Sequence, residues 1–258
     1  MSGGEVFRKG SARAPTGYFR WEAAGLAWLA QAPAGARVVE VLEQEEDHLD
    51  LRRLSFVNPT PQLAEAFGSA LARTHDAGAP AFGAAPPGWE GDGFLGPASE
   101  LLPLRLSPAD SWGEFYAGQR LLPTLSMGLD RGVYRRSDIG LFEAIARRLA
   151  AGEFDDGSPP ARLHGDLWAG NVLWTSDGGV LIDPAAHGGH RETDLAMLSL
   201  FGCPHWDFVI GGYLEQHRLD AQWRQRVGLH QLHPLMLHGV LFGADYPRRA
   251  LELARRYR

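Results

Sequence analysis

The residues of this sequence that are best suited to chemistry lie in one stretch of the second half of the chain. His164 and Asp166 stand two residues apart, and Asn171 completes the order Asp-x-x-x-x-Asn. A strand–turn–strand pattern with a Ser-Asp-Gly-Gly turn follows at 172–182, and Asp183 comes directly after it. Because a hairpin returns the chain to its starting point, we expect Asp183 to lie beside Asn171.

These side chains divide into a metal-binding pair and a proton acceptor. Amide and carboxylate oxygens, as on Asn171 and Asp183, are the hard ligands that Mg²⁺ prefers. Asp166 stands apart from that pair and is free to accept a proton from a substrate hydroxyl. This division of work is typical of kinase-type phosphoryl transfer, in which an Asn and a second Asp hold the metal on the nucleotide phosphates. The alternative, ordinary turn-forming residues, explains the residue types but not their order around a hairpin.

The elements that would position these residues form a small strand-rich segment followed by a larger helical one. The expected elements are strands at 5–9, 38–42, 48–54 and 161–163, and helices at 18–31, 62–76, 112–125 and 141–151. Residues 77–110 are rich in Gly, Pro and Ala and are expected to form long loops, and the chain after His190 is expected to be mostly helical. We place the border near Leu54, which gives domains 1–54 and 55–258.

Composition and charge exclude several classes of protein. The formal net charge of −6 gives no electrostatic footprint for nucleic acid. No apolar run approaches the ~18 residues of a membrane span, and the first residues do not resemble a signal peptide. The single cysteine, Cys203, cannot form an intrachain disulfide. We therefore expect a cytoplasmic protein with no nucleic-acid or membrane partner.

Lys9 is the one lysine among 25 basic residues, and the others are arginines. A position that tolerates arginine would be expected to carry it in such a chain. A compact ammonium and a planar guanidinium are not interchangeable at a tight phosphate contact. Lys9 is therefore either a chance surface residue or a lysine that its site requires.

The segments HGDLWAGNVL and IDPAAHGGHRETDLAML resemble the fructosamine (ketosamine) kinase family. This family is a branch of the aminoglycoside-phosphotransferase-like proteins. The similarity continues at 19–26, 68–75, 112–121 and 232–243, and it covers nearly the whole chain. The resemblance implies a two-lobed, protein-kinase-like α+β fold, with a small β-rich N-lobe at 1–54 and a helical C-lobe at 55–258.

The resemblance also implies a role for individual residues. Lys9 would contact the nucleotide phosphates, and Glu22, thirteen residues later, would pair with it. Asp166 would act as the catalytic base, with Asn171 and Asp183 as ligands of Mg²⁺. His164 and Asp194 are expected to support the catalytic loop rather than to react.

The substrate is expected to lie against residues that flank the catalytic loop. We interpret Trp168 as an apolar platform for the sugar-derived substrate; the alternative is that it packs the loop. His190 and Glu192 are expected to line the same pocket. Arg191 is either a third lining residue or the ion-pair partner of a neighbouring carboxylate.

The implied activity is ATP-dependent phosphorylation of a sugar hydroxyl of a ketosamine, free or protein-bound, with deglycation as the outcome. One alternative is a different small-molecule kinase, acting on an aminoglycoside or choline. The chain departs from the family at its start, since only eight residues precede Lys9 and the glycine-rich hairpin is missing. Ser2-Gly3-Gly4 could be its remnant. Three interpretations stay open: a start codon placed too late, a true N-terminal truncation, and a catalytically weak nucleotide-binding homologue.

Overall fold

The computed structural model describes residues 5–11, 13–97 and 100–258, so Ser2-Gly3-Gly4 lies outside the described residues. The strands are β1 (Val6–Gly10), β2 (Arg37–Val38), β3 (Val41–Gln44), β4 (His48–Arg52), β5 (Gly93–Leu95), β6 (Leu102–Leu104), β7 (Ala161–Leu163), β8 (Val172–Thr175), β9 (Gly178–Leu181) and β10 (His187–Gly189). The α-helices are α1 (Tyr18–Ala30), α2 (Pro61–Asp76), α3 (Trp112–Phe115), α4 (Leu122–Asp130), α5 (Ile139–Ala150), α6 (Glu192–Leu200), α7 (Trp206–Gln216), α8 (Trp223–Phe242) and α9 (Tyr246–Ala254). Among the helices of these residues, none is long and apolar enough to cross a lipid bilayer.

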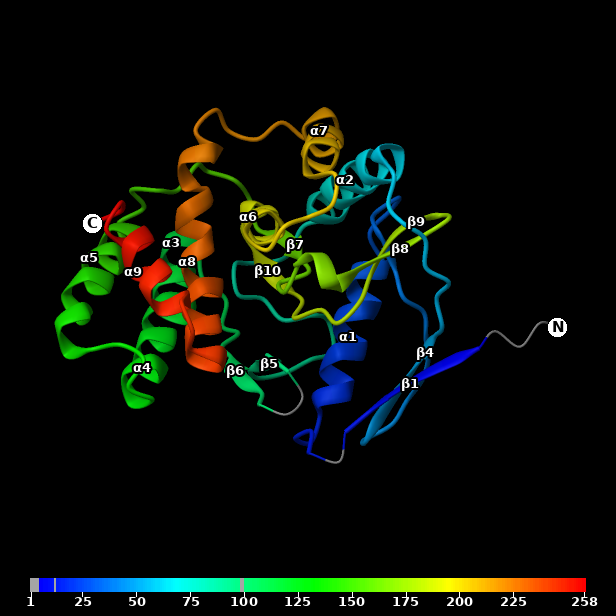
Figure 1. Ribbon diagram of the computed structural model, residues 1–258, viewed down its shortest axis with the longest axis horizontal. Helices are drawn as coiled ribbons and strands as arrows, with labels where there is room; N and C mark the ends of the chain where they lie inside the picture. Colours follow the sequence, from blue (N-terminus) through cyan, green and yellow to red (C-terminus); the bar gives the residue numbers. More distant parts are fainter. Residues whose placement is uncertain (1–4, 12, 98–99) are drawn as a thin grey trace.

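A three-stranded antiparallel sheet with the order β1–β4–β3 forms one end of the molecule, and α1 packs against it (Figure 1). Leu49 and Leu51 of β4 and Phe19 and Leu26 of α1 are buried in one apolar cluster. The predicted strands at both ends of this segment and the predicted helix are confirmed to within a few residues.

The strand expected at 38–42 is two strands, because the chain changes partner in the middle. β3 pairs with β4, whereas β2 pairs in parallel with β9, with Arg37 opposite Val180 and Val38 opposite Leu181. The N-terminal segment and the catalytic hairpin of the C-terminal segment therefore share one sheet.

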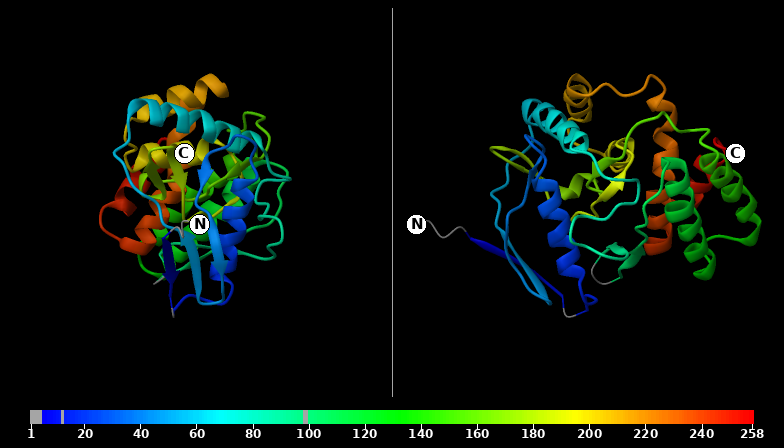
Figure 2. Two further views of the ribbon diagram at one scale, coloured as in Figure 1. Left: turned by 90° about the vertical axis from the view of Figure 1, so that its right-hand side faces the viewer. Right: turned by 180° about the vertical axis from the view of Figure 1, so that it is seen from behind.

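The opposite end of the molecule is helical. Figures 1 and 2 show α4, α5, α8 and α9 grouped there, with α2 beside α7 along one side. Phe142, Ile145 and Leu149 of α5 are buried on one face, as the helical spacing predicts, and they share a core with Leu229 and Leu232 of α8.

Two pairs of short antiparallel strands flank the catalytic loop, and β7 and β10 lie between the sheet end and the helical end (Figure 1). β8 and β9 form the predicted hairpin, with Val172 opposite Leu181 and Thr175 opposite Gly178. β7 pairs with β10, a strand that the sequence did not predict, with Leu163 opposite His187.

Two further regions differ from the prediction. The segment 77–110 contains the hairpin β5–β6, because Leu95, Leu102 and Leu104 are buried against the rest of the protein. Strands of three residues are too short to give a period-2 pattern in the sequence. The helix predicted at 112–125 extends to Asp130 and contains a π-helical segment at Tyr116–Leu121.

Candidate active site

One cavity of about 560 Å³ collects most of the predicted site residues. It lies where α1 and β1 face the catalytic loop. The predicted residues that line it are Lys9, Glu22, Asp166, Trp168, Asn171 and Asp183. Residues up to 174 positions apart in the sequence are thus brought together.

Lys9 joins the two halves of this cavity. Its Nζ lies 2.7 Å from Glu22 Oε2 on α1 and 3.0 Å from Asp183 Oδ1 after β9. Burial disfavours the ammonium, but the carboxylates of Glu22 and Asp183 outweigh burial and raise the pKa of Lys9 above its ordinary value. The lone lysine therefore stays charged and is held in place by two acidic side chains.

Asp166 is oriented by its neighbour in the Asp-x-x-x-x-Asn motif. Asn171 Nδ2 donates to the Asp166 carbonyl oxygen at 2.8 Å and to Asp166 Oδ2 at 3.3 Å. Burial raises the pKa of Asp166 to about 7, although the bond from Asn171 acts in the opposite direction. A carboxyl group with this pKa can exchange a proton near neutral pH.

Asn171 and Asp183 both line the cavity, at the two ends of the β8–β9 hairpin. The amide of Ile182 donates to the Asn171 carbonyl at 3.2 Å, which places the end of β9 against the start of β8. Asp183 has a left-handed backbone with φ of 51°, which is uncommon outside glycine, and its side chain is 41% exposed toward the cavity. Because the Asn171 Nδ2 donates to Asp166, the amide oxygen remains available. One amide and one carboxylate oxygen suit Mg²⁺.

His164 and Asp194 hold the catalytic loop through hydrogen bonds to its backbone. His164 Nε2 donates to the Ile182 carbonyl at 2.8 Å, and its Nδ1 accepts the amide of Asp166 at 3.2 Å. Asp194 of α6 accepts the amides of His164 at 2.8 Å and Gly165 at 3.0 Å. Both side chains are buried and hydrogen-bonded to the backbone around the loop, which is the position that a supporting residue requires.

Gly165 is required where it stands. Its φ is +82°, and a Cβ there would lie 2.1 Å from the Ala185 carbonyl oxygen. The tight turn of the loop that carries Asp166 therefore depends on a residue without a side chain.

Trp168 lies at the cavity with 43% of its surface exposed. A Cβ on Gly170 would lie 2.2 Å from the Trp168 ring, so this ring covers Gly170. An exposed indole beside Asp166 can offer an apolar face to a ligand, and its substrate role stays a prediction.

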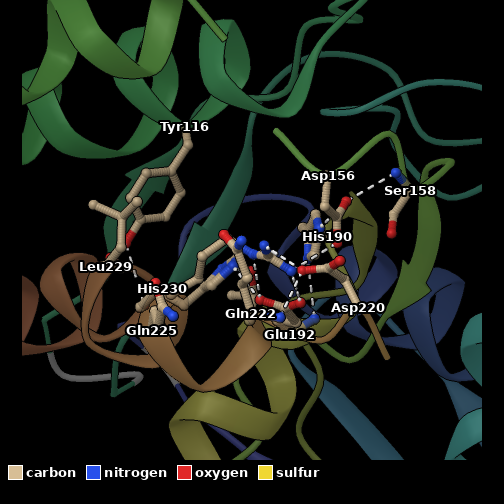
Figure 3. Close-up of polar contacts among 12 residues, drawn as sticks. Tyr116, Asp156, Ser158, His190, Glu192, Asp220, Gln222, Gln225, Leu229 and His230 are labelled. Atoms are coloured by element: carbon tan, nitrogen blue, oxygen red, sulfur yellow. Dashed lines mark hydrogen bonds and ion pairs between the residues drawn. The ribbon is translucent and has the colours of Figure 1, made fainter. Parts of the chain in front are cut away.

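His190 and Glu192 do not lie where the sequence analysis placed them. Both are at most 2% exposed, and neither is among the described residues that line the cavity. Figure 3 shows them in a buried polar cluster with Asp156, and His190 Nε2 lies 3.1 Å from Asp156 Oδ1. Arg226 donates to both oxygens of Glu192, at 2.6 and 3.0 Å. The substrate-lining prediction is corrected for this pair, because buried charges must be matched by partners inside the protein.

The same cluster could be mistaken for a metal site. Ligand atoms of His190, Glu192 and His230 lie within 4.8 Å of one another. The guanidinium of Arg226 already donates to both oxygens of Glu192 and would repel a metal cation bound there. We therefore assign a structural role to this cluster. Arg191 likewise forms an ion pair, with Asp76 at 2.8 Å.

Several lining residues were not found by sequence reasoning. Tyr18 lies beside Lys9, whose Nζ is 5.7 Å from the ring centroid. The wall formed by the C-terminal helices is aromatic and includes Phe201, His238, Phe242 and Tyr246. The one signal for His238 in the sequence is its place in the segment 232–243, which is similar to the fructosamine kinase family. Nothing in the spacing of these residues signals a shared cavity.

A small sheet lobe and a helical lobe, with a lysine–glutamate pair on one side of the cleft and a catalytic loop on the other, define the protein-kinase-like fold. Aminoglycoside phosphotransferase APH(2'')-Ib, solved with bound ADP, aligns with 92% of this chain and 82% of its own at a TM-score of 0.58 and 11% identity, which shows the fold alone. The model of the fructosamine kinase family matches residues 1–257, and this chain belongs to that family.

Individual relatives agree with this assignment. A crystal structure from Thermobifida fusca YX-ER1, assigned as a fructosamine-3-kinase, is 46% identical over 98% of this chain and 85% of that chain, with a TM-score of 0.89. The "Probable ketoamine kinase slr1563" of Synechocystis sp. is 32% identical over 72% of this chain, and the match spans only 59% of that relative. Members of the family carry the names of kinases, which are phosphotransferases.

Proposed function

We propose that this protein is an ATP-dependent kinase that phosphorylates a sugar hydroxyl of ketosamines, either free or on protein amines. Deglycation is the biological outcome that we assign to it, in a reducing cytoplasm. The observation that supports this proposal is the convergence of Lys9, Glu22, Asp166, Asn171 and Asp183 on one cavity in a chain of this family.

Each of these side chains has a definite task in the proposed reaction. Lys9, fixed between Glu22 and Asp183, holds the nucleotide phosphates by its charge. Asp166 accepts a hydrogen bond from the substrate hydroxyl and takes its proton as the phosphoryl group is transferred. Asn171 and Asp183 would hold Mg²⁺, which when bound neutralises charge on the phosphates.

The substrate side of the cavity favours a ketosamine over a polycationic aminoglycoside. Among the described lining residues, the carboxylates are Glu22, Asp166 and Asp183, all of which belong to the catalytic group. The remaining wall is aliphatic and aromatic and includes Trp168. A sugar with a single amine can pack against such a wall, whereas several ammonium groups would be left without partners.

Turnover measurements on defined acceptors test this proposal. ATP consumption is measured with fructoselysine, ribuloselysine and an aminoglycoside panel, and the phosphorylated position is read by ³¹P and ¹H NMR. We expect turnover with at least one ketosamine and none with the aminoglycosides. Aminoglycoside turnover alone would support the second kind of kinase, and ATP binding without any turnover would support the weak homologue.

Two variants connect the activity to the site. Asp166→Ala should abolish turnover while nucleotide affinity stays close to that of the wild type. The matched control, Asp177→Ala, changes an aspartate on the exposed β8–β9 turn and should leave turnover unchanged. If Asp166→Ala retains turnover within about tenfold (~1.4 kcal/mol of barrier), Asp166 is not the catalytic base.

A further inference from the structure

The segment Gly68-x-x-Leu71-Ala72-x-x-His75 of α2 makes a close contact with α7, and the roles of the catalytic residues do not explain this contact. Gly68 and His75 are seven residues apart, and so they lie on one face of the helix. A Cβ on Gly68 would lie 1.9 Å from the Val209 carbonyl oxygen of α7, and one on Gly212 would lie 2.1 Å from a carbonyl oxygen of α2. The two glycines let the helix backbones touch, which brings Tyr213 of α7 against His75.

His75 links Tyr213 to Asp194, the residue that holds the catalytic loop. Its ring is fully buried, with Nδ1 at 2.8 Å from the Tyr213 hydroxyl and Nε2 at 3.2 Å from Asp194 Oδ2. Burial opposes the charged form of Asp194, but the bond from His75 and the nearby amide donors outweigh it and lower its pKa, so the group is a carboxylate. A carboxylate only accepts, and His75 Nε2 must therefore carry the proton.

The proton positions along the rest of the chain follow from the same logic. Burial lowers the pKa of His75, so the ring is neutral and its Nδ1 accepts a bond from the Tyr213 hydroxyl. Arg191 can only donate, and its Nη1 lies 3.4 Å from the same hydroxyl and 2.8 Å from Asp76 Oδ1. The order of donation is therefore Arg191 to Tyr213 to His75 to Asp194.

We propose that Tyr213 is a positioning residue for phosphoryl transfer, and that its hydroxyl fixes the orientation of the His75 ring. With Nδ1 engaged by Tyr213, the Nε2–H group points at Asp194. Asp194 in turn holds the amides of His164 and Gly165, and so fixes the turn that carries Asp166. Without the hydroxyl, Nδ1 loses its donor, and the bond to Asp194 is the one hydrogen bond of the ring that is left among the described residues.

The test compares two buried tyrosines whose hydroxyls have different partners. Tyr213→Phe removes the bond to His75. Tyr116→Phe is the matched control, because the Tyr116 hydroxyl is equally buried but donates to the Leu229 carbonyl at 2.9 Å and accepts the His233 amide at 3.0 Å. Each variant loses one buried hydroxyl, so their losses of stability should be similar.

Three measurements separate positioning from general destabilisation. We expect Tyr213→Phe to lower kcat by about fivefold with the KM for ATP within about twofold, and Tyr116→Phe to leave both within about twofold. Hydrogen exchange of residues 163–167 should become faster in Tyr213→Phe only. The ¹⁵N spectrum of the His75 ring should show the Nε2–H tautomer in all three proteins, and the Nδ1 signal should shift to that of an acceptor without a hydrogen-bond donor in Tyr213→Phe only.

The kinetic part of this test rests on the proposed function, but the exchange and ¹⁵N measurements need no substrate. If the wild type turns over no ketosamine, the proposed function fails while these two measurements still decide the role of Tyr213. Equal exchange of residues 163–167 in both variants, or an unchanged His75 Nδ1 signal in Tyr213→Phe, would overturn the proposal.

Discussion

Replacing Asp194 with asparagine removes the acceptor on which the catalytic loop rests. Asp194 Oδ1 accepts the Gly165 amide, and Oδ2 accepts the His164 amide and His75 Nε2. An asparagine keeps one carbonyl oxygen and turns an NH₂ group toward at least one of these donors. Hydrogen bonds to a charged group contribute ~1.5–3 kcal/mol each, and a buried donor left without a partner costs ~1–3 kcal/mol.

The Asp194→Asn variant should therefore be about 3–5 kcal/mol less stable than the wild type. For a chain of this size that corresponds to a fall in Tm of about 6–20 °C. Urea unfolding and thermal denaturation measure the change, with Asp130→Asn, an exposed aspartate at the end of α4, as the control. A fall of less than about 1 kcal/mol in the free energy of unfolding would refute the reasoning, because the loss of buried hydrogen bonds to a carboxylate is expected to destabilise the protein by more than that.

Three further predictions concern the cavity and the buried cluster. Lys9→Arg keeps the charge, but a planar guanidinium cannot replace an ammonium 2.7 and 3.0 Å from two carboxylates, so kcat/KM should fall by more than about tenfold in a turnover assay. Gly170→Ala places a Cβ 2.2 Å from the Trp168 ring and should raise the ketosamine KM by about tenfold, with the KM for ATP unchanged. Arg226→Met leaves two buried carboxylates without their cation and should cost about 3–5 kcal/mol in denaturation experiments, with the ketosamine KM unchanged. A normal Lys9→Arg enzyme, an unaffected Gly170→Ala enzyme or a fully stable Arg226→Met protein would each contradict its own prediction.

The catalytic loop could be predicted from the sequence because its geometry is local. The hairpin that joins Asn171 to Asp183 spans a dozen residues, and its Gly-containing turn fixes the register. Residue type and short spacing were enough for this loop. The pairing of Lys9 with Glu22, by contrast, was implied by the resemblance to the family, and the structure places the two side chains 2.7 Å apart.

The buried networks could not be predicted, because their partners are distant in the chain. Glu192 has the residue type of a substrate ligand, but Arg226, 34 residues further on, donates hydrogen bonds to both of its oxygens. His75 reaches Asp194 across 119 residues. No periodicity or motif spacing contains such a contact, and only the packing of helices against one another creates it.

The pairing of β2 with β9 has a consequence for how the chain is made. Arg37 finds its partner at Val180, and Ser69 finds its hydrogen-bond acceptor at Gly212, both 143 residues later. A ribosome adding ~5–20 residues per second thus exposes β2 for about 7–30 seconds before β9 emerges. During synthesis β2 stays unpaired until β9 is made, so we expect the growing chain to be a client of chaperones that shield unpaired strand edges.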